Sequence, residues 1–246
     1  MRRTGSAILV ASMFVVGACG GSGPGAADTS GPTGSTAASG ANITLVLGTL
    51  GDDFYKAIEC GAKLESTAQG VNLDVQAPTA FDATLQVPIV NTIAATKPDA
   101  LIIAPNDSQA LFEPLKAIVD AGAKLVLVDT NLADTTLAEG HIGSDYVQYG
   151  EQGATELARA IGEKGKILGI FAPPGVSTND LGREGFTSAM QAFPNIDVLE
   201  FEFSSGEAGK SAEIVSAVLA ANPDLAGVFT FNGGDAPGVV TALTEA

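Results

Sequence analysis

The chain has 246 residues, enough for two compact α/β domains at about 100 to 150 residues each. Hydrophobic residues make up 46% and charged residues only 16%, which predicts a sizeable core and excludes a chain that is disordered throughout. The excess of 28 acidic over 12 basic residues gives a formal net charge of −16, which excludes nucleic acid as a partner because a polyanion is repelled. Two cysteines and one histidine cannot form a disulfide framework or a zinc cluster, so we expect no metal site and no cofactor.

Residues 1–18 have the features of a secretory signal. Arg2 and Arg3 precede an apolar run from residue 7 to residue 16, and small residues follow it. The run is too short to span a bilayer. Residues 16–19, Val-Gly-Ala-Cys, resemble the lipobox of bacterial lipoproteins, and this resemblance implies that Cys19 becomes the lipidated first residue of the mature protein. The alternative is an ordinary signal peptide with an incidental cysteine.

Residues 19–41 are predicted to be a flexible tether. The segment is almost wholly Gly, Ser, Thr, Pro and Ala, which cannot bury enough apolar surface to offset the entropy lost on ordering. A lipidated Cys19 followed by such a tether places a soluble body on the outer face of the cell membrane, or in the periplasm. Removal of residues 1–18, which contain two arginines and no acidic residue, changes the net charge from −16 to −18.

From residue 42 onward, apolar strands alternate with helices. The predicted strands are residues 43–47, 71–75, 100–104 and 124–128. The predicted helices are residues 53–69, 83–96 and 108–121. Continuous apolar strands that each precede a helix indicate a parallel sheet covered by helices on both faces.

The pattern restarts after a short segment at residues 141–144. Helices are predicted at residues 146–162, 182–193 and 209–221 and at the end of the chain, with strands at 166–171, 197–203 and 225–231. We therefore expect an N-terminal α/β lobe at residues 42–142 and a C-terminal lobe at 143–246. The second lobe has three predicted strands against four, so we expect it to be incomplete. The sequence is then either a fragment of a longer one, which we favour, or the product of a truncated gene.

The order of several short segments resembles the ribose-type periplasmic sugar-binding proteins. They are Gly48–Tyr55, Gly61–Ala62, Ile103–Ser108, Ala121–Asp129, His141–Asp145 and Asn222–Asn232. The resemblance covers residues 42–246 and implies a type I periplasmic-binding-protein fold, with two lobes joined by three crossings. It also implies that a ligand bound between the lobes is handed to an ABC importer.

Topology alone selects candidate ligand residues. In open parallel sheets, ligands bind beyond the carboxyl ends of the strands, where loops and helix N-termini converge. This rule selects Asp52, Asp53, Phe54, Tyr55, Asn106, Asp107, Asp129, Thr130 and Asn131 in the first lobe. In the second lobe it selects Ser177, Thr178, Asn179, Asp180, Arg183, Ser204, Ser205, Asn232 and Asp235. Carboxylates and amides suit the paired hydrogen bonds of vicinal hydroxyls, and an aromatic ring suits the C–H face of a sugar.

The resemblance narrows the candidates to Asp52, Phe54, Tyr55, Asp129 and Asn232. Asp52 stands where the family usually has Asn, and Thr130 stands where it usually has Arg. Arg183 lies one place out of register with the family's sugar-binding Arg, and the second-lobe aromatic falls on Gly206. These departures leave the identity of the sugar open.

Several candidates also have purely structural interpretations. Asp107 with Ser108 is typical of a helix N-cap, and Asp53 is an alternative cap for the first helix. Phe54 is open to interpretation as a core residue. We expect His141 to make a structural hydrogen bond and Cys60 to be an inert, buried thiol.

No motif indicates an enzyme. Residues 204–211 resemble a phosphate-binding loop but have serine where the first glycine is required, and no nucleophile elbow follows any strand. We expect a substrate-binding lipoprotein with a sugar ligand, an ABC permease as partner and a lipid anchor in the membrane. An exported receptor for a sensor kinase and a binder of amine-bearing or cationic molecules remain alternatives. A repressor with the same two-lobed body is disfavoured because its N-terminus would be a basic helix-turn-helix.

Overall fold

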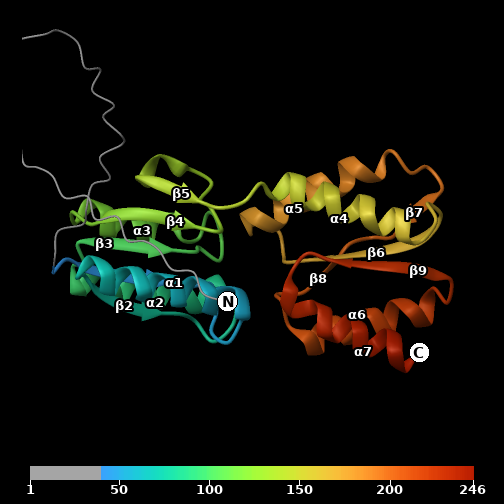
Figure 1. The fold of residues 1–246 in the computed structure, drawn as a ribbon, viewed down its shortest axis with the longest axis horizontal. Coiled ribbons are helices and arrows are strands. Elements are labelled where there is room, and N and C mark those ends of the chain that lie inside the picture. The colour runs from blue at the N-terminus through green and yellow to red at the C-terminus, as the bar shows by residue number, and fades with distance from the viewer. Residues whose placement is uncertain (1–39) are drawn as a thin grey trace, which may run out of the picture. The chain divides into compact units, whose positions relative to one another are not determined.

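The computed structural model describes residues 40–246 (Figure 1). The predicted signal peptide at 1–18, the lipidation site Cys19 and all but the last two residues of the tether at 19–41 lie outside the described residues, and these predictions stay open. No helix within residues 40–246 combines the length and the hydropathy needed to cross a membrane.

The first sheet is formed from residues 42–142. It contains β1 (Asn42–Val46), β2 (Asn72–Gln76), β3 (Ala100–Ile103), β4 (Lys124–Val128) and β5 (Gly140–Ile142). The strand order is β2-β1-β3-β4-β5, and every pairing is parallel. The prediction of four strands was therefore one short. His141 belongs to β5, which pairs with β4 through Leu127 and extends the sheet by three residues that are all exposed and carry no apolar signal.

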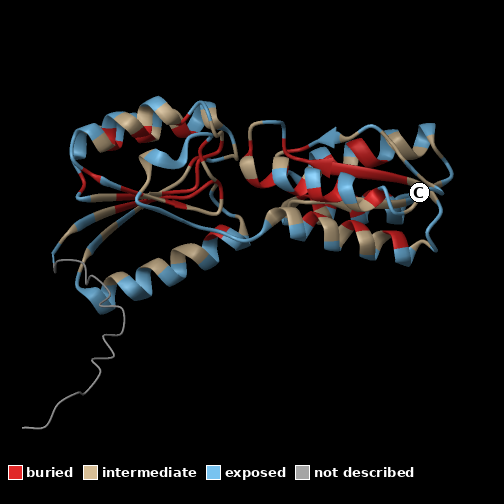
Figure 2. Ribbon diagram, turned by 90° about the horizontal axis from the view of Figure 1, so that it is seen from above, coloured by how far each residue is buried: buried red, intermediate tan, exposed pale blue. Residues whose placement is uncertain are grey.

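Helices α1 (Asp53–Gln69), α2 (Ala83–Thr96) and α3 (Phe112–Asp120) cover this sheet. Successive strand residues face opposite sides, so Leu45 packs with Tyr55 of α1 while Val46 packs with Ile93 of α2 and Leu115 of α3. Figure 2 shows the buried positions gathered along the strands and on the inner faces of the helices. Burial on both faces is the physical reason why these strands read as continuous apolar runs.

The cap of α1 and the start of α3 differ from the prediction. The N-cap of α1 is Asp52, whose Oδ1 accepts a hydrogen bond from the backbone N–H of Phe54 at 2.8 Å, so Asp53 is not the cap. Helix α3 begins at Phe112 instead of residue 108. The carboxylate of Asp107 accepts from the backbone N–H groups of Gln109 and Ala110, at 2.8 and 2.7 Å, and this turn precedes the helix.

The second sheet is centred on β6 (Gly165–Phe171). Strands β7 (Ile196–Val198) and β8 (Glu202–Phe203) pair with successive parts of one edge of β6, and β9 (Leu225–Thr230) pairs with the other edge. The single strand predicted at 197–203 is therefore two short strands. The chain leaves β6 between them, where Phe201 packs edge-on against Phe171 with ring centroids 5.2 Å apart.

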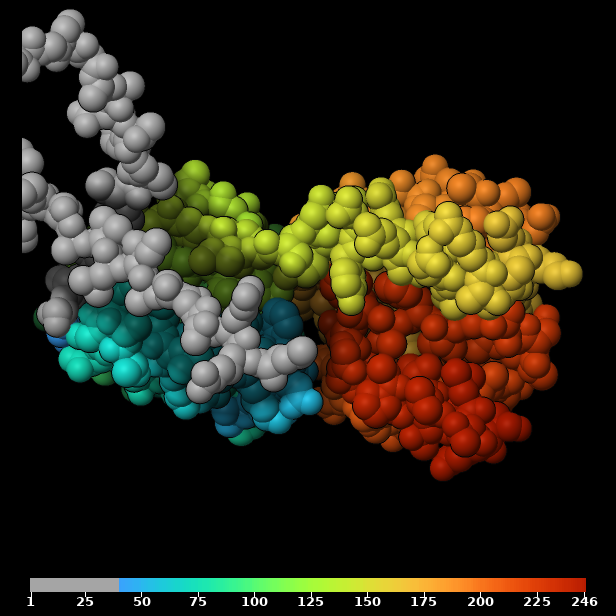
Figure 3. Space-filling model, viewed as in Figure 1, coloured from blue at the N-terminus to red at the C-terminus, as the bar shows by residue number. Residues whose placement is uncertain are grey.

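Helices α4 (Tyr146–Ala160) and α5 (Ser177–Met190) cover one face of the second sheet, and α6 (Ala208–Ala221) and α7 (Ala236–Glu245) cover the other (Figure 1). In Figure 3 the atoms of α6 and α7, in red, lie on the opposite side from those of α4, in yellow, and α5, in orange. Helices α4 and α5 approach closely because glycines face each other. A Cβ atom on Gly150 would lie 2.0 Å from the carbonyl oxygen of Gly182, and one on Gly185 would lie 2.0 Å from that of Val147.

Candidate ligand-binding site

Asp129 is the centre of the polar cluster in the first lobe. It follows β4 directly and has a φ of +62°, a left-handed conformation that Asp and Asn adopt more readily than most residues. Its backbone N–H donates to the carbonyl of Ile142 at 2.8 Å, and its carbonyl oxygen lies 3.0 Å from Nε2 of His141. The predicted structural hydrogen bond of His141 is thus confirmed, and it fixes the backbone from which the Asp129 carboxylate projects.

Two tyrosines donate hydrogen bonds to this carboxylate. The Tyr55 hydroxyl donates to Oδ2 at 3.1 Å, and the Tyr146 hydroxyl donates to Oδ1 at 2.5 Å. Burial raises the pKa of Asp129, while the hydrogen bonds from Tyr146 and Tyr55 lower it. Burial also raises the pKa of both tyrosines, so they remain neutral donors. Each carboxylate oxygen keeps capacity to accept a further hydrogen bond from a ligand hydroxyl.

The first turn of α1 places an aromatic pair beside the carboxylate. Tyr55 is buried and stacks on Phe81, with ring centroids 6.4 Å apart. Phe54 is 52% exposed and meets Tyr55 edge-on at 5.2 Å, so it is not a core residue. Asp52, the predicted polar ligand residue of this loop, uses Oδ1 to cap the helix. Its charge contributes to the raised pKa of Asp129, which puts the two carboxylates in one cluster.

Buried polar atoms continue along the carboxyl ends of the strands. Thr130 is fully buried, and its hydroxyl has no hydrogen-bond partner among the described residues. Nδ2 of Asn106 donates to the carbonyl of Gly48 at 2.8 Å. Gln86 of α2 joins the ends of β1 and β3, because its amide donates to the carbonyls of Leu47 and Ala104 and accepts from the N–H of Asn106. Sequence reasoning missed Gln86, although a glutamine inside the apolar stripe of α2 was a signal.

In the second lobe, Asn232 follows β9 and lies in a polar cluster of its own. Its Oδ1 accepts from Nδ2 of Asn179 at 3.1 Å, and its Nδ2 donates to Oδ2 of Asp235 at 3.2 Å. Asn179 belongs to α5, which begins at Ser177 and not at the predicted residue 182. The polar residues predicted for a loop after β6 are therefore held on the first turn of a helix.

Three hydrogen bonds connect loops of the first lobe with residues after 142. The N–H of Ser108 donates to the carbonyl of Gly175 at 3.0 Å, and the N–H of Asn131 donates to Oγ of Ser177 at 2.7 Å. The third is the bond from Tyr146 to Asp129. The loops after β3 and β4 thus contact the segment after β6, as expected if the carboxyl ends of the two sheets contribute to one site. Tyr146 was missed by sequence reasoning, and its place directly after the helix cap Asp145 was the available signal.

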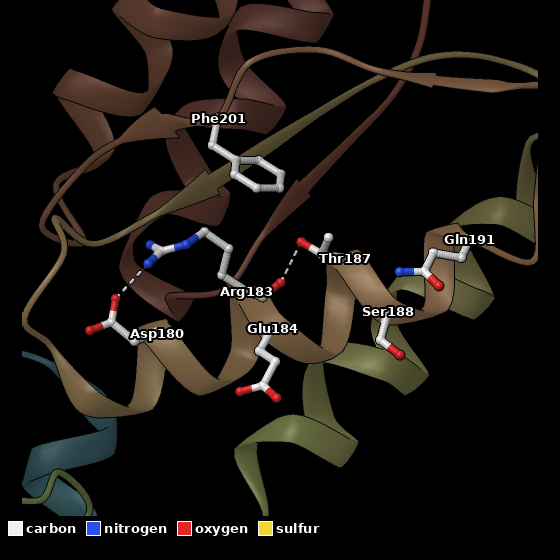
Figure 4. Close-up of a pocket in the computed structure, with 7 residues that line it drawn as sticks. All are labelled: Asp180, Arg183, Glu184, Thr187, Ser188, Gln191 and Phe201. Atoms are coloured by element: carbon white, nitrogen blue, oxygen red, sulfur yellow. Dashed lines mark hydrogen bonds and ion pairs between the residues drawn. The ribbon is translucent and has the colours of Figure 1, made fainter.

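Arg183 occupies a separate place. Its Nη2 donates to Oδ1 of Asp180 at 2.7 Å, and its Nη1 is buried without a partner among the described residues. Figure 4 shows its side chain beside Phe201 in an open pocket of about 490 Å³. None of the other six predicted ligand residues lines this pocket, so the structure does not bring Arg183 together with them.

Two other sequence predictions concern cysteine and metal. Cys60 is exposed on α1, so the prediction of a buried thiol was wrong. It lies at a shallow surface pocket with Lys56, Lys63 and Leu64 instead of facing the core. Within residues 40–246, no group of three or more histidine, cysteine, aspartate and glutamate side chains is arranged to hold a metal ion.

Comparison with known proteins identifies the family. The periplasmic binding protein domain matches residues 43–246. The chain belongs to this periplasmic binding protein family. The chain is 29% identical over 212 residues to a D-ribose/D-allose-binding protein of Pseudomonas aeruginosa, covering 83% of this chain and 66% of that one. It is 25% identical over 245 residues to the ribose import binding protein of Bacillus subtilis, covering 100% of this chain and 78% of that one.

Solved structures of periplasmic binding proteins share the fold. An ABC transporter solute-binding protein from Agrobacterium vitis, bound with α-D-tagatopyranose, has a TM-score of 0.80 and 39% identity, over 82% of this chain and 71% of that one. A periplasmic solute-binding protein from Actinobacillus succinogenes with bound D-allose has a TM-score of 0.74 and 27% identity, over 82% of this chain and 73% of that one. These matches confirm the predicted ribose-type resemblance and the type I periplasmic-binding-protein fold.

Family membership also decides two broader questions. Periplasmic binding proteins are substrate-binding proteins of ABC transporters and not enzymes, as the absence of a catalytic motif in the sequence predicts. Members of this family and the relatives act in the periplasm or outside the cell membrane, so the protein is located outside the cytoplasm. The chain spans about two thirds of the length of the Pseudomonas relative, at 66%.

Proposed function

We propose that this protein is the lipid-anchored substrate-binding component of an ABC importer and that it binds a small polyhydroxylated ligand, a sugar. The observation that carries the proposal is the partly buried Asp129 carboxylate, which Tyr55 and Tyr146 orient at the carboxyl end of β4. A carboxylate held in this way accepts hydrogen bonds from two neighbouring hydroxyls, and vicinal hydroxyls are the common feature of monosaccharides.

The other predicted residues have complementary roles in this proposal. Phe54 is exposed beside Tyr55 and covers the C–H face of the sugar ring. The unpartnered hydroxyl of Thr130 and the carboxylate of Asp52 supply further polar contacts from the first lobe. Asn232 supplies the amide of the second lobe, and the ligand binds between the two. Arg183 is the least supported ligand residue because it lines a different pocket.

The ligands of the relatives support a monosaccharide. The Agrobacterium vitis protein was solved with D-tagatopyranose and the Actinobacillus succinogenes protein with D-allose, and the Pseudomonas protein is named for D-ribose and D-allose. The structural cluster around Asp129 contains acceptors and neutral tyrosine donors, which suits a neutral, hydroxyl-rich molecule.

The test is a calorimetric titration of the full-length protein with D-tagatose, D-allose, D-ribose and D-arabinose. We expect at least one of them to bind with a Kd in the micromolar range or tighter, about −8 kcal/mol or stronger. The proposal is overturned if none of the four sugars binds. A diamine, putrescine, serves as the comparison ligand, because Asp52 and Asp129 are close enough for their charges to interact and would favour a cation. Binding of putrescine without binding of any sugar would establish the cationic alternative.

The membrane partners need separate experiments. We propose that Cys19 carries the lipid and that residues 19–41 tether the binding domain to the membrane, where the ABC permease receives the ligand. Labelling of cells with a radioactive fatty acid should mark the wild-type protein and not Cys19→Ser. Uptake of the bound sugar should depend on the protein if it serves an importer. Uptake that is unchanged by deletion of the gene, with loss of a sugar-induced transcriptional response, would instead establish the sensor-kinase receptor.

A further inference from the structure

The side-chain amide of Asn232 is held between two buried polar side chains. Asn179 donates to its oxygen at 3.1 Å, and its nitrogen donates to Asp235 at 3.2 Å. Asn179 exposes 3% of its surface and Asp235 exposes none. Burial of polar and charged groups is unfavourable unless they are hydrogen-bonded, so these bonds govern how the buried cluster is arranged.

The direction of these bonds follows from a backbone group at the end of β6. The backbone N–H of Ala172 can only donate, and it donates to Oδ1 of Asn179 at 2.8 Å. The NH₂ group of Asn179 is therefore the one that faces Asn232, which must present its carbonyl oxygen. On the other side, the carboxylate of Asp235 accepts and so receives the NH₂ group of Asn232. If the Asn232 amide were rotated by 180°, its NH₂ group would face the NH₂ group of Asn179. Its oxygen would then face the carboxylate of Asp235, and both hydrogen bonds would be lost.

This arrangement leaves one defined donor on Asn232. Its oxygen already accepts from Asn179, and one of its two N–H groups already donates to Asp235. We propose that Asn179 and Asp235 are positioning residues that determine specificity: they fix Asn232 so that its second N–H donates to an acceptor oxygen of the sugar. The inference rests on the proposed role of Asn232 in sugar binding. Asn179 and Asp235 act through Asn232 and do not themselves contact the ligand.

The state of the Asp235 carboxyl group supports this role. Its Oδ1 is buried and has no hydrogen-bond partner among the described residues, while Oδ2 accepts from Asn232 and Thr230. Burial raises the pKa of Asp235, and hydrogen bonds from neighbouring side chains oppose this effect. Burial of a carboxyl group is costly even where hydrogen bonds compensate it, so Asp235 is a poor means of stabilising the fold. Its benefit is the orientation that it imposes on Asn232.

The first test needs no ligand. The side-chain amide signals of Asn232, assigned by comparison with Asn232→Ala, are recorded in ¹⁵N–¹H correlation spectra of the full-length protein. We expect the proton bonded to Asp235 to lie downfield and to move upfield in Asp235→Asn. Ser211→Ala removes a hydrogen bond to the backbone carbonyl of Asp235, 2.9 Å long, without touching its carboxylate, and should leave the Asn232 signals in place. Unchanged Asn232 signals in Asp235→Asn would overturn the proposal.

The second test is a double-mutant cycle on the Kd for D-tagatose. Asp235→Asn should weaken binding about tenfold in the wild-type background and should have no further effect in Asn232→Ala, because it acts only through that amide. Equal effects in both backgrounds, or an unchanged Kd, would contradict the inference. Asn179→Ala removes the donor on the other side of Asn232 and replaces Asp235→Asn in both tests if that variant does not fold. If the wild type binds no sugar, the proposed function fails, and the amide spectra alone decide the positioning of Asn232.

Discussion

The hydroxyl of Tyr146, the first residue of α4, donates a 2.5 Å hydrogen bond to Oδ1 of Asp129, the residue after β4. The two residues lie on either side of the predicted lobe boundary near residue 142. This bond therefore ties the start of the second lobe to the carboxylate that we propose as the principal sugar ligand of the first. Substitution of Tyr146 should therefore change the hydrogen bonding of the Asp129 carboxylate.

Tyr146→Phe is predicted to destabilise the protein. Loss of the hydroxyl removes a hydrogen bond to a charged, partly buried carboxylate, which costs about 1–3 kcal/mol. The free energy of unfolding in urea measures the effect. Tyr149→Phe is the matched control, because Tyr149 lies on the same helix, is 57% exposed and makes no hydrogen bond to Asp129. Equal stabilities of the two variants would show that the Tyr146 bond contributes nothing.

Asp129→Asn is predicted to weaken sugar binding without loss of the fold. Asparagine tolerates the left-handed conformation at φ +62°, so the backbone is kept. An amide has one acceptor oxygen where the carboxylate has two, and we expect the Kd to rise at least about tenfold, or 1.4 kcal/mol. Titration calorimetry of the variant with the sugar that the wild type binds gives the value. A Kd equal to that of the wild type would remove Asp129 from the site.

The stability of the protein should carry a pH dependence from Asp235. Burial raises its pKa in the folded state above the ordinary value of 3.8. The folded state therefore binds the proton more tightly, and the contribution of Asp235 to stability is present below pH 3.8 and is lost as pH rises through the folded-state pKa. Asparagine does not titrate, so Asp235→Asn removes this loss of stability at higher pH. We expect the stability of Asp235→Asn relative to the wild type to increase between pH 4 and pH 7 in urea unfolding.

Asp134→Asn is the control of opposite sign. The pKa of Asp134 is lowered by hydrogen bonds from Thr136, so its contribution is present above the ordinary value and is lost as pH falls. The stability of Asp134→Asn relative to the wild type should therefore decrease as pH rises. If the relative stabilities of Asp235→Asn and Asp134→Asn changed in the same direction with pH, the opposite pKa shifts assigned to Asp235 and Asp134 would be contradicted.

Two glycine substitutions are predicted to have opposite effects. The Cβ atom of Gly185→Ala would lie 2.0 Å from the carbonyl oxygen of Val147, so α4 and α5 must separate, at a cost of about 1–3 kcal/mol. The Cβ atom of Gly61→Ala on α1 meets nothing within 4 Å. This variant should gain about 0.5–1 kcal/mol, because alanine favours the helix. Thermal unfolding distinguishes them, and a stable Gly185→Ala would contradict the close packing of the two helices.

The alternation of apolar strands and amphipathic helices was enough to predict the parallel sheets and most element positions. Helices α1 and α2 begin and end where the periodicity predicts. Each failure has a physical cause. Strand β5 is exposed at every position and so lacks an apolar pattern, and α3 begins late because Asp107 forms a turn first. The interruption between β7 and β8 depends on Phe201 packing on Phe171, a contact between residues 30 positions apart that no short sequence window contains.

For the site, the sequence by itself determined which loops follow the strands and therefore which polar residues gather near Asp129 and Asn232. Only the tertiary structure decided how those residues are used. Tyr146, Asn179 and Asp235 acquire their roles from partners distant in the chain or from a turn of the backbone, and Arg183 is directed into another pocket. Strand and helix periodicity depends on neighbours along the sequence, whereas the direction of a hydrogen bond depends on where a partner atom lies in space.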